Sequence, residues 1–146
     1  MGSATDRNVR KAREVRFFVR QSIEARVIRT LFDTNILIDY LNGVPAAEAL
    51  VEKTRHRMVS VVTWMEVLAG ARTPEEEDVI EMFLRDFRLV ELSRPVARGA
   101  VALRKARRLR LPDAIILATA QHESALLVTR NTKDFPAGDP GVHVPY

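Results

Sequence analysis

The chain contains no cysteine, no internal repeat, no low-complexity tract and no long apolar run. Without cysteine it cannot build a disulfide framework, a thiolate nucleophile or a zinc site with thiolate ligands. Its three histidines are scattered and fit no zinc-binding spacing. No apolar stretch approaches the ~20 residues of a membrane helix, and the charged N-terminal segment lacks the apolar centre of a signal peptide. We therefore expect a soluble, cytoplasmic protein that does not enter a membrane.

Lysine and arginine are unevenly distributed along the chain. Residues 1–29 hold eight of them against three Asp/Glu, whereas residues 30–146 hold fifteen against sixteen. The net charge of +4 therefore comes from residues 1–29, which we interpret as a basic N-terminal extension before a single domain at residues 30–146. Such an extension either adds affinity for RNA or DNA, or is a solvated segment or sequence upstream of the natural start.

Strand-like and helix-like apolar patterns alternate along the domain. The strands are predicted at residues 27–32, 58–62, 87–92, 126–129 and 142–144. The helices are predicted at residues 36–41, 45–55, 63–71, 73–84, 94–109 and 112–123. Strands separated by helices favour an α/β fold with a mostly parallel central sheet and helices on both faces.

Four acidic residues lie where a strand pattern gives way to a turn or a helix start: Asp33, Glu66, Asp113 and Asp134. The carboxyl ends of parallel strands share one edge, where ligands bind, so the four side chains are expected to converge. Crowded carboxylates repel one another, by roughly 4 kcal/mol per pair at about 4 Å and an effective dielectric of about 20. Their oxygen atoms suit Mg²⁺ or Mn²⁺. The pattern therefore predicts a divalent-metal site for phosphodiester hydrolysis.

Each acid also has a purely structural explanation. Asp33 is suited to cap the helix that follows it. Thr63 and Glu66 have the spacing of a capping box, in which the Glu reaches back to the amide of the cap residue. Asp113 falls in the first turn of a helix, where the helix dipole favours a negative charge, and Asp134 could support a turn. The shared edge favours the metal site over four separate explanations.

Other charged residues have simpler interpretations. Thr73 and Glu76 also have capping-box spacing, and Asp39 is expected to be solvated on the outer side of its helix. The basic residues at 104–110 either complement the dipole at a helix C-terminus or contact phosphates at the rim of the acidic site. The same two roles apply to the basic residues at 130–133.

Four segments, in order, resemble the motifs of the PIN domain family, in particular its VapC-type ribonuclease toxins. Residues 31–41 (LFDTNILIDYL) closely resemble the opening of these proteins, and residues 60–70 (SVVTWMEVLAG) look like the segment that carries the family's Glu. Residues 111–118 (LPDAIILA) and 127–135 (LVTRNTKDF) look like the third and fourth acidic motifs. The resemblance covers about residues 30–146.

This resemblance implies a PIN-like three-layer fold and a metal-dependent endoribonuclease, the toxin of a type II toxin–antitoxin pair. It implies Mg²⁺ or Mn²⁺ as cofactor, RNA as substrate, a homodimer, and inhibition by a small antitoxin. We expect the antitoxin to insert a cationic side chain into the acidic site. The catalytic and metal-binding residues would be Asp33, Glu66, Asp113 and Asp134, and Asn131 competes with Asp134 for the fourth position. The substrate-binding candidates are Thr34, Asn35, Arg108, Arg110, Thr129, Arg130 and Asn131.

The sequence leaves two alternative functions open. A PIN-like module that only binds RNA or a partner would show no cleavage with or without EDTA. A DNA nuclease of the same fold would cleave single-stranded DNA in preference to RNA.

Overall fold

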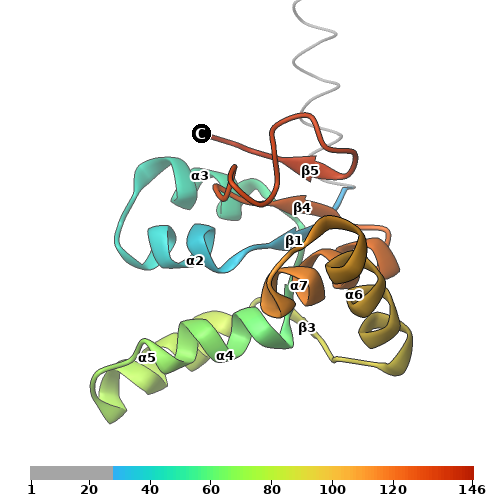
Figure 1. Cartoon of the computed structure of the whole chain (residues 1–146). Coiled ribbons are helices and arrows are strands. Elements are labelled where there is room, and N and C mark those ends of the chain that lie inside the picture. Colours follow the sequence, from blue (N-terminus) through green and yellow to red (C-terminus); the bar gives the residue numbers. More distant parts are fainter. Residues whose placement is uncertain (1–27) are drawn as a thin grey trace, which may run out of the picture.

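Five parallel strands form the centre of the protein in the computed structural model, of which residues 28–146 are described (Figure 1). The proposed extension therefore lies almost entirely outside the described residues. In spatial order the sheet is β3-β2-β1-β4-β5, and every strand pair is parallel. The strands are β1 (Arg29–Phe32), β2 (His56–Ser60), β3 (Arg88–Val90), β4 (Leu126–Val128) and β5 (Val142–His143).

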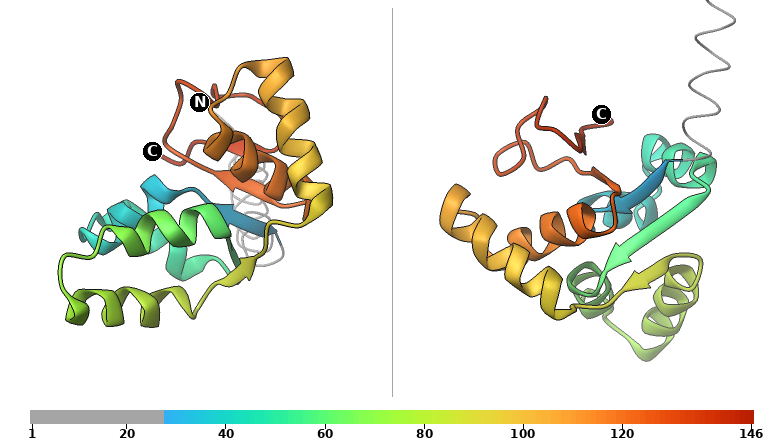
Figure 2. Two further views of the ribbon diagram at one scale, coloured as in Figure 1. Left: turned by 60° about the horizontal axis from the view of Figure 1, so that its bottom comes forward. Right: turned by 90° about the vertical axis from the view of Figure 1, so that its right-hand side faces the viewer.

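Helices cover both faces of this sheet (Figure 2). They are α2 (Thr34–Leu41), α3 (Pro45–Lys53), α4 (Val61–Ala69), α5 (Pro74–Leu84), α6 (Arg94–Arg107) and α7 (Leu111–His122). Successive strand residues point to opposite faces, so Leu31 packs in the core formed with α6 and α7, whereas Phe32 packs in the core formed with α2, α3 and α5. This three-layer arrangement confirms the predicted fold class.

The strand order reverses between β1 and β4. From β1 the chain moves outward through β2 to β3, and then returns through α6 and α7 to β4 on the other side of β1. In parallel α/β sheets, ligands bind at the carboxyl ends of the strands beside such a switch point. Asp33 directly follows β1, Thr129 directly follows β4, and the Asp33 N–H donates to the carbonyl of Val128 (2.9 Å). The fold thus places the first predicted acid at the switch point.

Helix α4 begins two residues earlier than the sequence pattern predicted. Its N-cap is Ser60, whose hydroxyl accepts a hydrogen bond from the N–H of Thr63 (3.1 Å). The predicted capping box of Thr63 and Glu66 is therefore wrong, because Thr63 already lies within the helix. The β-branched pair Val61–Val62 resembles a strand ending, but Ser60 is the better cap and ends the strand before it. Glu66 therefore does not take part in a capping box at the start of α4.

Candidate active site

Asp33 is held in place by three neutral hydrogen-bond donors. Its Oδ1 accepts from the N–H of Thr34 (2.8 Å), so it does cap α2, as the structural explanation predicted. Its Oδ2 accepts from the hydroxyl of Thr129 (2.7 Å) and from the amide of Asn35 (3.2 Å). Burial raises the pKa of the Asp33 carboxyl, and these three hydrogen bonds act in the opposite direction. The capping role and a site role are therefore compatible.

Glu66 reaches the same edge from the middle of α4. Its Oε1 lies 3.3 Å from the hydroxyl of Thr34, which also lies 3.2 Å from the hydroxyl of Thr63. Partial burial raises the pKa of Glu66, and the negative charges of Asp33 and Asp113 raise it further. Glu66 is exposed, whereas Asp33 is buried.

Asp113 lies in the first turn of α7, as predicted. The Nε of Arg110 donates to its Oδ2 over 3.3 Å, but the Arg110 side chain is 79% exposed, so this ion pair is weak. Burial raises the pKa of Asp113, and the charges of Asp134 and Asp33 add to this effect against the influence of Arg110. This acid is surrounded by like charge and has one loosely held counter-ion.

Asp134 and Asn131 are bonded to each other in the loop after β4. The Asn131 amide donates to Asp134 Oδ2 (2.9 Å), and the Asp134 N–H donates to Asn131 Oδ1 (3.2 Å). The Asn131 N–H donates to the hydroxyl of Thr129 (2.9 Å), which in turn bonds Asp33. The loop is anchored by the fully buried Phe135. Both candidates for the fourth position therefore belong to one hydrogen-bonded unit, joined through Thr129 to Asp33.

The structure brings all four acids to one edge. The charge of Asp134 acts on Asp33 and Asp113. The charges of Asp33 and Asp113 act on Glu66. Within residues 28–146, Asp33, Glu66 and Asp134 form no ion pair with a Lys or Arg. The same region holds no group of three or more carboxylates or imidazoles already close enough to enclose an ion. The donor set nevertheless fits Mg²⁺ or Mn²⁺, since Mg²⁺ binds through one or two carboxylates and keeps several waters. The catalytic and metal-binding roles stay predictions.

The basic residues near the site have unequal environments. Arg104 donates to the carbonyl of Leu109 (2.8 Å), and Arg107 pairs with Asp139, so both have structural partners. Arg108 ends α6 in the left-handed conformation (φ 56°), which is uncommon for a residue with a side chain. Arg110 contacts Asp113. Among the basic residues at 104–110, Arg108 and Arg110 are still predicted to contact the substrate.

Asp39 was expected to be solvated, and this expectation is wrong. Its carboxylate accepts two hydrogen bonds from Arg130, at 2.5 Å and 3.0 Å, and one from the hydroxyl of Tyr146 (2.9 Å). The reason is tertiary: Arg130 follows β4 and Tyr146 follows β5, and both reach the outer side of α2. One sequence signal was available, because Asp39 lies four residues after Asn35 and therefore on the same side of the helix.

Comparison with known proteins shows the family of this chain. The chain matches the PIN domain family over residues 30–138. It therefore belongs to the PIN domain family. Within that family it is similar to VapC proteins: it is 33% identical over 114 residues to ribonuclease VapC10 of Mycobacterium tuberculosis (strain CDC 1551 / Oshkosh), covering 73% of this chain and 85% of the relative.

Solved structures share the fold of this chain. A chain in a toxin-antitoxin complex from Klebsiella pneumoniae is 48% identical, with a TM-score of 0.75 over 80% of this chain and 98% of that one. FitAcB from Neisseria gonorrhoeae is 24% identical, with a TM-score of 0.66 over 80% of this chain and 97% of that one, and supports the fold alone.

None of the helices within residues 28–146 has the length and apolar character needed to cross a membrane.

Proposed function

We propose that this protein is a cytoplasmic endoribonuclease that hydrolyses RNA phosphodiester bonds with Mg²⁺ or Mn²⁺, and that it is the toxin of a type II toxin–antitoxin pair. The observation that carries the proposal is the gathering of Asp33, Glu66, Asp113 and Asp134 beside the switch point of a PIN domain. The names of its relatives, a VapC ribonuclease and a toxin-antitoxin complex, support the substrate and the biological role.

The acids would hold the ion, and neighbouring polar groups keep them in place. Asp33 is oriented by Thr129 and Asn35 before any ligand binds. Asp134 is oriented by Asn131, which we assign to the same site. A divalent ion bound there would activate water and stabilise the leaving oxygen. The cations of Arg108 and Arg110, with the hydroxyl of Thr34, supply contacts for substrate phosphates at the rim.

The direct test is cleavage of matched single-stranded RNA and DNA by the purified full chain, with Mg²⁺, Mn²⁺ or excess EDTA. We expect cleavage of RNA only, stopped by EDTA. Undiminished cleavage in EDTA would refute the metal mechanism, preferred cleavage of DNA would indicate a DNA nuclease, and RNA binding without cleavage would indicate a silent module.

The products should carry 5′-phosphate and 3′-hydroxyl ends, because water activated by a metal needs no 2′-hydroxyl. Products with 2′,3′-cyclic phosphate ends would contradict this.

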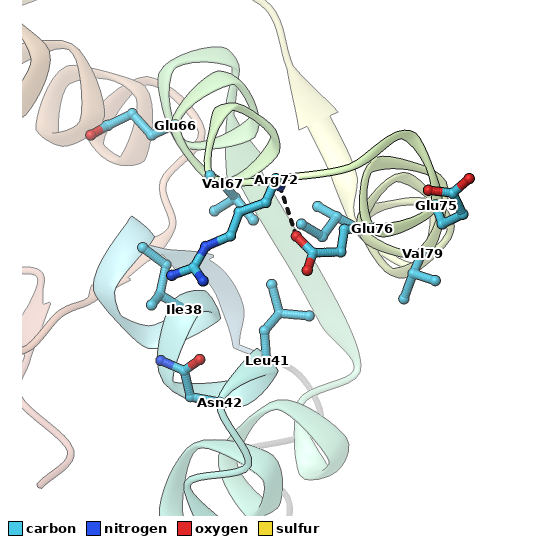
Figure 3. Close-up of a pocket in the computed structure, with 11 residues that line it drawn as sticks. Ile38, Leu41, Asn42, Glu66, Val67, Arg72, Glu75, Glu76 and Val79 are labelled. Atoms are coloured by element: carbon cyan, nitrogen blue, oxygen red, sulfur yellow. Dashed lines mark hydrogen bonds between the residues drawn. The ribbon is translucent and has the colours of Figure 1, made fainter.

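An apolar groove next to the acids supports the proposed antitoxin partner. It lies between α2, α4 and α5, has a volume of about 590 Å³, and includes Ile38, Leu41 and Val79 in its lining (Figure 3). Glu66 also lines it, so the groove runs to the acidic site. We propose that an apolar antitoxin segment occupies it and directs a cationic side chain at the carboxylates. A homodimer, which the family resemblance implies, is proposed as well and can be checked by sedimentation.

Two exposed residues of α5 provide a matched test of this groove. Val79 lines it and is 62% exposed, whereas Met82 is similarly exposed but is not part of the lining. Val79→Asp should weaken inhibition by the antitoxin at least tenfold without changing cleavage of RNA, because a charge would be buried in an apolar contact. Met82→Asp should leave inhibition unchanged. Equal inhibition of both variants would place the antitoxin elsewhere.

A further inference from the structure

Three side chains from separate segments meet on the outer side of α2. Asp39 belongs to α2, Arg130 follows β4, and Tyr146 follows β5. The guanidinium of Arg130 donates to both carboxylate oxygens of Asp39. The hydroxyl of Tyr146 donates to Oδ2 of Asp39, which also accepts from Arg130 Nε at 2.5 Å. Two-pronged contacts of this kind fix orientation as well as distance. The guanidinium of Arg130 is therefore engaged by protein through its Nε and Nη2 atoms.

The backbone of Arg130 connects this group of side chains to the acidic site through Asn35. Its N–H donates to Oδ1 of Asn35 (3.0 Å). The other end of the same amide, Nδ2, lies 3.2 Å from Asp33 Oδ2 and 3.3 Å from the hydroxyl of Thr129. An amide oxygen can only accept and an amide nitrogen can only donate, so the N–H of Arg130 selects which end of Asn35 faces the carboxylate. If that contact is lost, a flipped amide can present its oxygen to Asp33 and repel it.

We infer that Asp39, Arg130 and Tyr146 are positioning residues, which hold the amide of Asn35 in the orientation that fixes Asp33 for metal binding. This inference rests on the proposed metal-dependent nuclease function. It assigns Arg130 an indirect role, in place of the substrate contact that its sequence position suggested. It also adds Asp39 and Tyr146, which lie outside all four acidic motif positions.

The competing explanation is that Asp39 and Arg130 form an ordinary surface ion pair. Exposed pairs contribute little to stability and have no reason to influence a metal site. The chain offers a matched control in Glu123, which accepts from Arg29 (2.5 Å) and Arg88 (3.4 Å). The Asp39 and Glu123 side chains are 13% and 14% exposed, and each carboxylate has two donor residues. Arg29 pairs from the first residue of β1, whereas the acidic site follows the last residue of that strand.

The experiment compares Asp39→Asn with Glu123→Gln in the full chain. Affinity for Mn²⁺ is measured by electron paramagnetic resonance without RNA, and kcat, KM and Tm are measured in parallel. Loss of partners outside the first ligands of a metal commonly lowers affinity or activity about 10- to 100-fold. We expect about tenfold weaker Mn²⁺ binding and lower kcat with little change in KM for Asp39→Asn, and less than about twofold changes for Glu123→Gln. Tyr146→Phe, which removes one hydroxyl, should give a smaller change in the same direction.

A coupling test shows whether the effect passes through Asn35. In an Asn35→Ala background, Asp39→Asn should have no further effect on Mn²⁺ affinity, because the connecting amide is gone. Additive losses in the double variant would overturn the inference, as would Asp39→Asn and Tyr146→Phe variants that both behave like Glu123→Gln. Asp33→Asn serves as the reference for the site. If Asp33→Asn binds Mn²⁺ as tightly as the wild type does, the proposed metal function is wrong. If Asp33→Asn loses Mn²⁺ binding but Asp39→Asn and Tyr146→Phe keep it, only the positioning role is wrong.

Discussion

The β1 side and the α7 side of the acidic edge hold their carboxylates by different means. On the β1 side, Asp33 is 4% exposed and receives three hydrogen bonds from neutral donors. On the α7 side, Asp113 has one long contact with a largely exposed arginine. Neutral donors orient a carboxylate without neutralising it, whereas a mobile cation neutralises without orienting it. The first side is organised by the protein itself, whereas the second carries negative charge that the proposed metal ion would compensate.

Asp113→Asn should give the largest effect. We expect it to abolish RNA cleavage while leaving the metal-free protein as stable as the wild type or more so. Asn keeps the shape of Asp at the helix start but loses the dipole interaction, worth about 0.3–1 kcal/mol, and relieves repulsion from the other acids. Functional residues often carry a stability cost of this kind.

Thermal melts with and without Mg²⁺, beside a cleavage assay, test this prediction. Mg²⁺ should raise the Tm of the wild type more than that of the variant, because a ligand of the folded state stabilises by mass action. If Asp113→Asn melts several degrees lower without metal and still cleaves RNA, then Asp113 is a helix-start residue and the site has been misassigned.

Thr129→Val addresses the β1 side and should rank second. Val has nearly the same shape, but its methyl group can neither donate to Asp33 nor accept from the N–H of Asn131. Losing a hydrogen bond to a charged group costs about 1.5–3 kcal/mol, so the Tm should fall clearly. Arg110→Gln, on the α7 side, should change stability by less than about 1 kcal/mol. Equal losses from the two variants, in chemical denaturation, would remove the contrast between the two sides.

The difference between local patterns and tertiary contacts explains what the sequence could and could not predict. Asp33 and Asp113 were placed correctly, because a strand ending and a helix start are local patterns. The start of α4 was misplaced, since the β-branched pair Val61–Val62 fits a strand as well as a helix. The contacts of Asp39 reach partners 91 and 107 residues away. Its spacing from Asn35 indicates a shared side of the helix but identifies neither partner. The existence of these contacts depends on the order of strands in the sheet.

A pH dependence of stability in EDTA should be the smallest effect and the most specific. Burial raises the pKa values of Asp33 and Asp113, so the folded state binds their protons at higher pH than the unfolded state does. Their ionisation therefore opposes folding at neutral pH, and stability from these groups increases as the pH falls toward the usual aspartate range. Asp39 behaves oppositely: its pKa is lowered chiefly by the hydrogen bond from Arg130, so its stabilisation is lost only at lower pH.

Comparison of the wild type with Asp113→Asn isolates this effect, because the remaining titrating groups are shared. Between neutral pH and about pH 5, just above the ordinary aspartate pKa of about 3.9, the wild-type Tm should rise relative to that of the variant. The variant lacks one titrating carboxyl, whose pKa is raised in the wild type chiefly by burial. The curves should converge as the pH falls, since protonation removes from the wild type the same charge that the substitution removes. Parallel curves would mean that Asp113 does not share an acidic cluster, and the α7 side would then need no ion to compensate it.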